Sequence, residues 1–314
     1  MTLYEGIALI QEKQAVVLDL GTDYTKFGFT GEAAPRCIIR SEFWCPVERK
    51  NKRVFEYRTP EELYDNLVQM LHLLYFRHVL VNPKERKVVV VESLLTPTLV
   101  RETLAKVLFT HYEVSGVIWA DSPRMCALTL GTPVTLIVSI GAREAEVSAV
   151  AHACPVLRAI QSQPLAARAI HDELSRLLDI DNNTELHLPD HIIEDIKVKT
   201  CFVSSRERAE LCRSDKPPAP AKGLKARLGH ELKYLVSQPP YNEKLHINVF
   251  KFHSAPAHDN SVAWLGGALV GAGDAGASRA MGRDVYMRDK RLKDWVCLLD
   301  NTPNDHPHRE NMEI

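Results

Sequence analysis

The chain has 314 residues, of which 45% are hydrophobic and 25% are charged, a composition typical of soluble globular proteins. Its formal net charge of −1 excludes a global electrostatic field that would attract nucleic acid or an anionic membrane. The length allows a large core and two lobes. The seven cysteines are dispersed without a CxxC pair, so we expect reduced thiols and a cytoplasmic location rather than a disulfide framework or a zinc site.

The first predicted element is a strand, a tight turn and a second strand over residues 16–29, VVLDLGTDYTKFGF. Asp19 lies at the end of the first strand, Gly21 and Thr22 form the turn, and Lys26 lies in the second strand. Such a turn can direct backbone N–H groups toward a phosphate, while the carboxylate holds a hydrated magnesium ion. The stretch therefore raises nucleotide binding as a hypothesis.

Helices and strands then alternate along the chain. Thr59 followed by Pro60 predicts a helix start, and apolar residues follow at helical spacing: Leu63, Leu67, Met70, Leu71 and Leu74. Residues 87–91 predict a strand buried on both faces. A helix should follow Thr96 and Pro97, with one apolar side made of Val100, Leu104, Val107 and Leu108, and residues 116–119 predict the next strand. This alternation predicts an α/β fold with a largely parallel central sheet.

A possible internal repeat connects the two halves of the chain. Residues 136–141, LIVSIG, have the outline of residues 16–21, VVLDLG, and each segment is followed by an alternating stretch, at 25–29 and at 146–150. Two lobes that each open with a strand, a turn and a strand would place their turns face to face across a cleft. The pattern alone leaves chance similarity open as an alternative.

The remaining elements are less regular. We expect a helix from Asp190, a Pro/Ala-rich linker at 214–222, a helix over 224–235, a strand over 247–252 and a frayed end at 301–314. The basic cluster at 49–53 is interpreted as a solvated loop rather than a nuclear signal. The GxGxxG match at 271–276 follows a helical pattern, so it is interpreted as a helix end and not as a dinucleotide fingerprint. The longest weakly polar window, 261–272, is too short for a membrane span.

Four ordered segments resemble actin and the actin-related proteins. The first carries nine matching positions: Asp19, Gly21, Lys26, Gly28, Phe29, Gly31, Pro35, Arg36 and Ser41. The others are residues 81–97, residues 194–203 (EDIKVKTCFV) and residues 261–267 (SVAWLGG). The resemblance implies an actin-like fold, with duplicated ribonuclease-H-like lobes around a central cleft. It implies a first lobe of residues 1–130 plus 261–314, with an outer subdomain reduced to about 41–57, and a second lobe of residues 131–260, shortened around 213–222.

Within this family the chain resembles the divergent actin-related subunits at the pointed end of dynactin, through residues 3–6, 194–204, 261–268 and 294–297. The resemblance implies a structural role in the cytoplasm and cytoskeleton. It implies contacts with the actin-like filament protomers of dynactin, with dynactin subunits four, five and six, and indirectly with dynein. No nucleic acid partner and no direct membrane insertion are expected.

The departures from the family pattern argue against catalysis. Family members carry an acid in each phosphate turn, but the second turn here has Ser139 and Ala142, and Arg143 replaces a glycine. The residues that correspond to the nucleotide cleft are Asp19, Gly21, Thr22, Lys26, Gly141 and Lys197. Asp23 adds a negative charge beside the phosphate position, where the family usually has glycine. We therefore expect no catalytic residues, no metal site and no required cofactor, with weak ATP or ADP binding left open.

Two alternatives stay open at this level. The first is a working, nucleotide-switched ATPase of the actin type. The second is an actin-related subunit of a nuclear chromatin complex, for which the basic cluster at 49–53 is the sequence feature.

Overall fold

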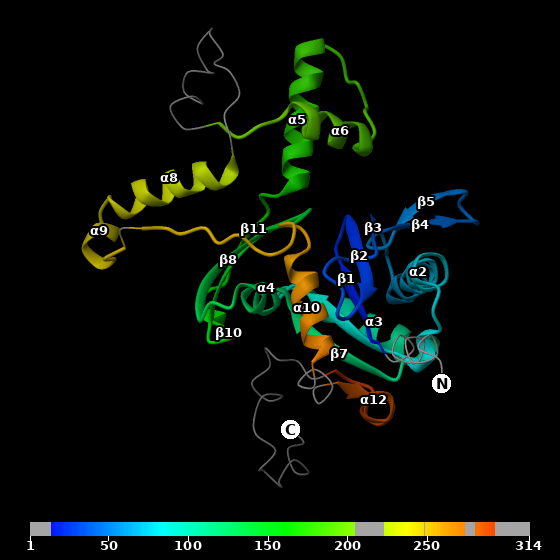
Figure 1. Cartoon of the computed structure of the whole chain (residues 1–314). Helices are drawn as coiled ribbons and strands as arrows, with labels where there is room; N and C mark the ends of the chain where they lie inside the picture. The colour runs from blue at the N-terminus through cyan, green and yellow to red at the C-terminus, as the bar shows by residue number, and fades with distance from the viewer. Residues whose placement is uncertain (1–13, 205–222, 248, 274–279, 293–314) are drawn as a thin grey trace, which may run out of the picture. The chain divides into compact units, whose positions relative to one another are not determined.

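The computed structural model describes residues 14–204, 223–247, 249–273 and 280–292 (Figure 1). Its main feature is a six-stranded sheet in the order β12-β7-β6-β1-β2-β3. The strands are β1 (Val16–Leu20), β2 (Tyr24–Phe29), β3 (Cys37–Arg40), β6 (Lys87–Glu92), β7 (Gly116–Asp121) and β12 (Met281–Gly282). Within the described chain, no helix has the length and apolarity needed to cross a bilayer.

The predicted α/β class is confirmed, but the expectation of a largely parallel sheet is wrong. Strand β6 runs parallel to both β1 and β7, whereas β1–β2, β2–β3 and β7–β12 are antiparallel. The reason is the length of the connections. The few residues between β1 and β2 can form a hairpin, whereas a parallel pairing needs a crossover of a dozen or more residues.

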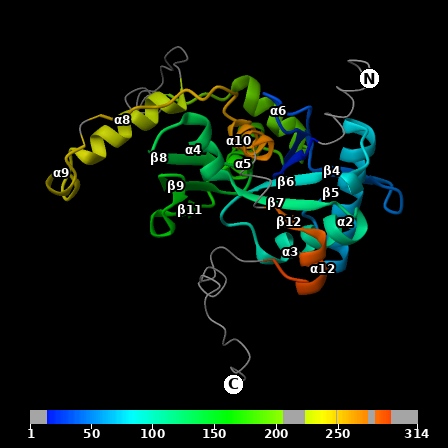
Figure 2. The same cartoon turned by 60° about the horizontal axis from the view of Figure 1, so that its bottom comes forward.

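Both faces of the sheet are covered by helices. On β1, Val16 and Leu18 point into one apolar cluster, and Val17 points into the other. The first cluster includes residues of α2 (Pro60–Leu73) and α3 (Thr98–Lys106), and the second includes residues of α4 (Ser122–Leu130) and α10 (Val262–Ala272). Figure 2 shows α10 on one side of β6 and β7 and α3 on the other. This two-sided burial explains the unbroken valine run of β6.

The two helices expected in the first part of the chain are confirmed. Thr59 caps α2, because its hydroxyl accepts a hydrogen bond from the Glu62 amide at 3.2 Å. Each helix continues into a π-helical turn, η1 (Leu74–Val79) after α2 and η3 (Val107–His111) after α3. The predicted apolar positions of both helices lie in the core: Leu63, Leu67, Met70, Leu71, Leu74, Val100, Leu104, Val107 and Leu108.

Helices α4 and α10 pack closely on each other. A methyl group added at Gly266 of α10 would lie 2.2 Å from the Met125 carbonyl oxygen of α4, so the approach requires glycine. Trp264 of α10 is fully buried, and its indole N–H donates to the Val17 carbonyl at 3.2 Å. Helix α10 ends at Ala272, which agrees with the interpretation of the glycine-rich stretch as a helix end. Residues 274–276 lie outside the described residues.

The basic cluster forms a strand, which corrects the expected loop. Strand β5 (Lys50–Arg53) pairs with β4 (Glu42–Cys45) in a two-stranded hairpin. Lys52 pairs with Glu62 of α2, and Lys50 pairs with Glu48 at 2.8 Å. Cross-strand pairing and these carboxylates order the cluster, although its lysines and asparagine have a low strand propensity. Residues 41–57, predicted as a reduced outer subdomain, are built around this hairpin.

A second sheet is formed by strands around β9. Strand β9 (Ala145–Ala151) pairs with β8 (Val134–Ile140), β10 (Cys154–Pro155) and β11 (Gln161–Gln163), which are drawn in green in Figure 1. Strand β8 and strand β9 match the strands expected from the internal repeat.

The chain divides into two compact units. Within the described residues, the first comprises 14–138, 147–161, 256–273 and 280–292, and the second comprises 139–146, 162–204, 223–247 and 249–255. The sequence-based division, which assigned residues 131–260 to the second lobe, stays a prediction. Strand β10 contacts α4, and the His152 amide donates to the Pro133 carbonyl at 2.6 Å, so residues 147–161 cluster with the first unit.

The second unit is built mainly from helices α5 (Ala167–Asn182), α6 (Asp190–Thr200), α8 (Leu224–Val236) and α9 (Tyr241–Lys244). Helices α6 and α8 confirm the two helices expected there, but the described residues of 247–252 form no strand, so that prediction is wrong. In the described part of this unit, only Glu146, Ala166 and Ile193 are buried. The unit therefore has no hydrophobic core of its own among these residues. The predicted linker at 214–222 and the end at 301–314 lie outside the described residues.

Candidate functional site

The first phosphate-type turn contains a tight ion pair. Asp19 of β1 lies opposite Lys26 of β2 in the strand register, and the Lys26 ammonium is 2.7 Å from an Asp19 carboxylate oxygen. The Lys26 side chain is 14% exposed and the Asp19 side chain is 18% exposed. The β1–β2 pairing thus places both residues that the sequence assigned to phosphate and magnesium in contact with each other.

The turn that follows is closed by its own hydrogen bonds. The Gly21 amide donates to the Tyr24 carbonyl at 3.2 Å, and the Ser41 hydroxyl donates to the Gly21 carbonyl at 2.6 Å. Ser41 also lies 2.8 Å from the Thr25 hydroxyl oxygen. A methyl group at Gly21 would lie 2.6 Å from the Tyr24 carbonyl oxygen, so this turn requires glycine.

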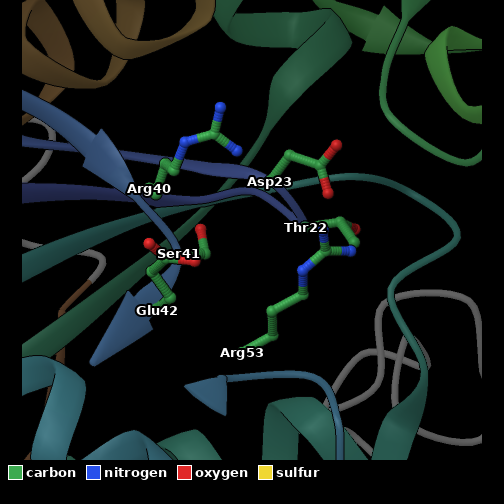
Figure 3. Close-up of a pocket in the computed structure, with 6 residues that line it drawn as sticks. All are labelled: Thr22, Asp23, Arg40, Ser41, Glu42 and Arg53. Atoms are coloured by element: carbon green, nitrogen blue, oxygen red, sulfur yellow. The ribbon is translucent and has the colours of Figure 1, made fainter. Parts of the chain in front are cut away.

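A small cavity adjoins the turn in the first unit. Figure 3 shows its lining residues, which are Thr22, Asp23, Arg40, Ser41, Glu42 and Arg53. Its volume of about 10 Å³ is enough for roughly one water molecule. Two arginines line the same cavity as Asp23, so the negative charge that the sequence places here is accompanied by positive charge from β3 and β5.

Three acidic residues lie at or next to the carboxyl ends of the three neighbouring strands β1, β6 and β7. Asp19 is the next-to-last residue of β1 and lies opposite Val91 of β6. Glu92, the last residue of β6, lies opposite Asp121, the last residue of β7. Each acid has a cationic partner. Glu92 is 2.9 Å from Arg101, Asp121 is 3.1 Å from Arg124, and Asp19 binds Lys26. The carboxyl ends of parallel strands are a common position for binding sites in α/β proteins.

The sequence interpretation missed Glu92 and Asp121 as members of this row. The available signal was their position at the ends of two predicted buried strands. Among the described residues, no group of three or more His, Cys, Asp or Glu side chains is arranged to hold a metal ion.

The start of α4 adds two titratable groups to this edge. Asp121 caps the helix by accepting a hydrogen bond from the Arg124 amide at 3.0 Å. Burial raises the pKa of Asp121, and the nearby Arg124 charge opposes that rise. Burial also raises the pKa of Cys126 to about 11, and the negative charge of Asp19 adds to the effect. At neutral pH the Cys126 thiol is therefore protonated and is a poor nucleophile.

The second turn is closed by the same type of backbone hydrogen bond as the first. The Gly141 amide donates to the Glu144 carbonyl at 3.0 Å, as the Gly21 amide does to the Tyr24 carbonyl. The side chains differ, because Ser139 stands at the position of Asp19 and Glu146 at that of Lys26 when the two glycines are aligned. The Gly141 carbonyl accepts from the Ala167 amide at 3.2 Å, at the start of α5. The backbone of the repeat is therefore present without its ion pair.

The six predicted cleft residues fall into two groups. Asp19, Gly21, Thr22 and Lys26 lie in the first unit, and Gly141 and Lys197 lie in the second. Lys197 of α6 is partly buried, and its ammonium is 2.7 Å from Nε2 of His171 on α5. Lys197 thus links the two helices α5 and α6.

Comparisons with known proteins show similarity to actin and the actin-related proteins. The sequence profile of the family described as Actin matches residues 62–216. Actin-related protein 10 of Dictyostelium discoideum is 24% identical over 248 residues, which cover 63% of this chain and 52% of that protein. Residues 62–216 thus carry an actin-family domain. A second relative within the actin-related proteins, actin-related protein 4 of Candida albicans, is 23% identical over 193 residues, with 56% of this chain and 40% of that protein covered.

The aligned part of this chain spans about half of the length of the first relative and less than half of the second. Its mixed α/β architecture agrees with the actin-like fold that the sequence predicted.

The family implies a bound nucleotide with magnesium, and the fit of the residues can be tested. In the first turn the Asp19 carboxylate and the Lys26 ammonium neutralise each other. In the second turn, Ser139, Ala142 and Arg143 supply no carboxylate that could ligate magnesium, and the carboxylate of Glu144 accepts a hydrogen bond from the Ser162 hydroxyl at 3.3 Å. This donor set does not fit a metal–phosphate centre that uses an acid from each turn. The arrangement is suited to stabilising two hairpins.

Proposed function

We propose that this actin-related protein is a non-catalytic structural subunit that caps the pointed end of the actin-like filament of dynactin. The observation that carries the proposal is the hairpin β4–β5. Residues 41–59 lie between β3 and α2 and form this one hairpin, where actin has a long outer subdomain that docks the next protomer. A filament grows through heterologous contacts, so a protomer with one docking face missing can join an end and stop extension.

The partners of this proposal are the actin-like filament protomers of dynactin and its subunits four, five and six, with dynein as an indirect partner. The named relative, actin-related protein 10, supports the choice within the family. The role is structural, and its proposed location is the cytoplasm and cytoskeleton.

The absence of enzyme activity is part of the proposal. Hydrolysis would need acids in both turns to support the charge of the transferred phosphate. Ser139 and Ala142 stand in place of those acids, and Asp19 is held by Lys26. Neither ATP nor ADP is required for the proposed role, because capping depends on surfaces and on no chemical step.

A pointed-end elongation assay tests the capping role. Actin filaments with blocked barbed ends are allowed to grow, and the full chain is added at increasing concentration. Elongation should stop when the concentration of the chain approaches that of the filament ends. Undiminished elongation at a large excess of the chain would contradict the proposed cap.

Affinity capture tests the partners. The tagged full chain, captured from cytosol and sedimented, should travel in a large particle with the filament protomers and the pointed-end subunits. The same particle should form in cytosol depleted of nucleotide. A chain that sediments alone in both preparations would contradict the proposed assembly.

The nucleotide-switched ATPase is the second candidate, because the first turn keeps Asp19, Gly21 and Lys26. A phosphate-release assay separates the two candidates, with actin under the same conditions as the positive control. We expect no release above the protein-free blank. Release that Asp19→Asn abolishes would favour the ATPase.

A nuclear chromatin subunit is a weaker candidate. Its sequence feature, the basic cluster, is engaged in ion pairs, because Lys52 contacts Glu62 and Lys50 contacts Glu48. Exclusion of the tagged chain from nuclei would reject it, whereas nuclear accumulation would favour it over the dynactin role.

A further inference from the structure

A groove in the first unit is lined by residues of both π-helical turns. Its volume is about 400 Å³, which is within the range of ligand sites in proteins. Phe76 of η1, His111 of η3 and Lys84 of the short helix η2 (Pro83–Glu85) all contribute to the lining. Every lining residue belongs to the first unit, and none of them is a residue of the predicted nucleotide cleft.

The backbone of the segments around this groove is unusual. π-Helical turns are rare and occur frequently at functional sites. Leu80, which follows η1, has a φ of 56°, and Glu113, two residues after η3, has a φ of 48°. Such left-handed conformations are uncommon for residues other than glycine, and they cluster at ligand-binding and active sites. The backbone thus indicates a functional role for the groove.

Two pairs of aromatic rings line the groove. The ring centroids of His72 and Phe76 are 4.7 Å apart, and those of His111 and Tyr112 are 4.8 Å apart. Phe76 is 47% exposed, so its ring is accessible to a ligand. Tyr112 is buried, and its hydroxyl donates to the Val68 carbonyl at 2.7 Å, which fixes the orientation of the ring. The groove therefore offers flat apolar surfaces.

The polar side chains of the groove supply mainly hydrogen-bond donors. The Lys84 ammonium is 2.6 Å from a Glu113 carboxylate oxygen, but an ammonium has three N–H donors and this side chain is 66% exposed. Asn82 accepts from the Lys84 amide with its side-chain oxygen at 3.1 Å, and its NH₂ group is a donor. His72 and His111 each carry at least one N–H in either protonation state.

The charge of the groove is positive. Glu113 is the one carboxylate among the described lining residues, and it is already shared by two cations. Its oxygens are 2.6 Å from the Lys84 ammonium and 3.3 Å from the Arg283 guanidinium, so these three groups together have an excess of one positive charge. A complementary ligand therefore has acceptors and negative charge rather than donors and positive charge.

We propose that this groove binds a proline-rich segment of a partner protein that carries acidic residues. Proline has no backbone N–H, so such a segment presents apolar rings and carbonyl acceptors. Its prolines pack on the rings of Phe76 and His72, in the manner of other aromatic-lined grooves that bind polyproline II helices. Lys84 binds a carboxylate of the segment. The inference does not rest on the capping role, since other elements than the β4–β5 hairpin form the groove.

A peptide-binding experiment tests the proposal. The probe is a fluorescent peptide of three Pro-Pro-Glu repeats, added to the full chain and followed by anisotropy. A polyproline II helix has three residues per turn, so the carboxylates of this peptide lie along one edge. Phe76→Ala should weaken binding about tenfold or more, because it removes an aromatic contact surface. Trp44→Ala, which removes a 60% exposed ring from β4, is the matched control and should leave binding unchanged.

Related peptides separate the contributions of proline and of charge. A peptide of three Ala-Ala-Glu repeats keeps the charge but lacks the rings and the preformed helix, so it should bind about tenfold more weakly to the unaltered chain. Lys84→Gln should weaken binding of the Pro-Pro-Glu peptide about two- to fivefold, the range for an exposed ion pair, and should not change binding of a Pro-Pro-Gln peptide. Lys50→Gln, at a side chain that is 64% exposed and ion-paired with Glu48, is the control and should change neither.

The position of the bound peptide needs its own readout. A photocrosslinker at the centre of the Pro-Pro-Glu peptide should label residues within 72–84 or 107–113. This experiment and the comparison of peptides use the unaltered chain, so neither depends on the folding of a variant.

Several results would overturn the proposal. These are no saturable binding of the probe, equal binding of the Pro-Pro-Glu and Ala-Ala-Glu peptides, equal binding by Phe76→Ala and the unaltered chain, or crosslinks confined to other segments. Self-association that Phe76→Ala abolishes, without peptide binding, would assign the groove to a second copy.

The chain also has prolines of its own at positions 217, 218 and 220. Replacement of these three prolines by serine should leave binding of the probe unchanged. Tighter binding of the probe by that variant would assign the groove to the chain's own proline-rich segment and would reject a partner protein.

Discussion

Gly21 and Gly141 occupy the same position in two hairpins but have different space around them. A methyl group would lie 2.6 Å from the Tyr24 carbonyl oxygen at Gly21, and 3.4 Å from the Glu144 carbonyl oxygen at Gly141. The first distance requires a shift of the backbone, whereas the second is an ordinary contact. Gly21→Ala should therefore lower the free energy of unfolding by about 1–3 kcal/mol, as measured by urea denaturation.

Gly141→Ala is the matched control for that experiment. It should change the free energy of unfolding by less than about 0.5 kcal/mol, the usual range for surface substitutions. Equal losses at the two positions would mean that the turns differ less than their geometry indicates.

Asp121 combines a helix cap with an unfavourable burial. Because burial raises its pKa in the folded state above the ordinary value of 3.8, the folded protein binds its proton more tightly than the unfolded chain does. The stability contributed by this group is present at low pH and falls as the pH rises from 3.8 through the raised pKa. Asp121→Asn keeps the cap and removes the charge, so its stability relative to the unaltered protein should increase between pH 4 and pH 7.

Urea midpoints at the two pH values measure this difference. Asp121→Ala serves as the control, because it also removes the charge but lacks the cap, so it should be about 1 kcal/mol less stable than Asp121→Asn at both pH values. If Asp121→Asn loses relative stability on going to pH 7, the ion pair with Arg124 outweighs the burial of the charge.

At the scale of elements, the contact between α4 and α10 depends on one glycine. A methyl group at Gly266 would lie 2.2 Å from the Met125 carbonyl oxygen, a backbone atom that cannot rotate away. Gly266→Ala should therefore separate the two helices and lower the free energy of unfolding by about 3 kcal/mol, at the upper end for overpacking. Calorimetric melting temperatures report this loss.

Gly273→Ala, one residue beyond the end of α10, is the control for the helix contact. Its added methyl group would meet carbonyl oxygens at 3.7 Å or more, so the melting temperature should stay within a few degrees. A similar fall for both variants would indicate a general intolerance of α10 rather than a close helix crossing.

Elements with regular apolar spacing could be predicted from the sequence. Helix α2 shows five apolar residues at helical spacing after a Thr–Pro cap, and β6 shows an uninterrupted valine run, so both were identified. The first hairpin of the candidate site was found for the same reason, together with Asp19, Gly21 and Lys26. That Asp19 and Lys26 bind each other follows from strand register, which the local pattern does not specify.

Two elements could not be predicted because their state depends on distant neighbours. Residues 247–252 have strand composition, but a strand forms only with a partner, and the described residues there have none. The lysine-rich β5 has a poor strand composition, yet β4 and Glu62 order it. Glu92 and Asp121 entered the site only when the order of strands placed their ends side by side.

At the scale of the whole molecule, the two units differ in how many residues they bury. The first has two apolar clusters around the six-stranded sheet, whereas the described residues of 162–255 bury only Ala166 and Ile193. Segments with few buried apolar contacts open at low free energy. Limited proteolysis of the native chain should therefore cut first within residues 162–255 and leave a resistant core of residues 60–130.

Mass spectrometry of early fragments identifies the cut sites. Amide hydrogen exchange provides an independent control, since α5 and α8 should exchange much faster than α2 and β6. Equal protection of α2 and α8 against hydrogen exchange would contradict this difference. It would imply that other protein surface covers the second unit in solution.

The hydrogen bond from the Trp264 indole to the Val17 carbonyl joins residues 247 positions apart in the chain. During synthesis, the face of β1 and β6 that contains Val17 and Val89 emerges from the ribosome long before α10 does. At about 5–20 residues per second, the roughly 140 residues between the end of β7 and α10 take about 7–28 s to synthesise. One apolar face of the nascent sheet therefore stays exposed to solvent during this time. We expect the growing chain to bind chaperones that recognise exposed hydrophobic segments.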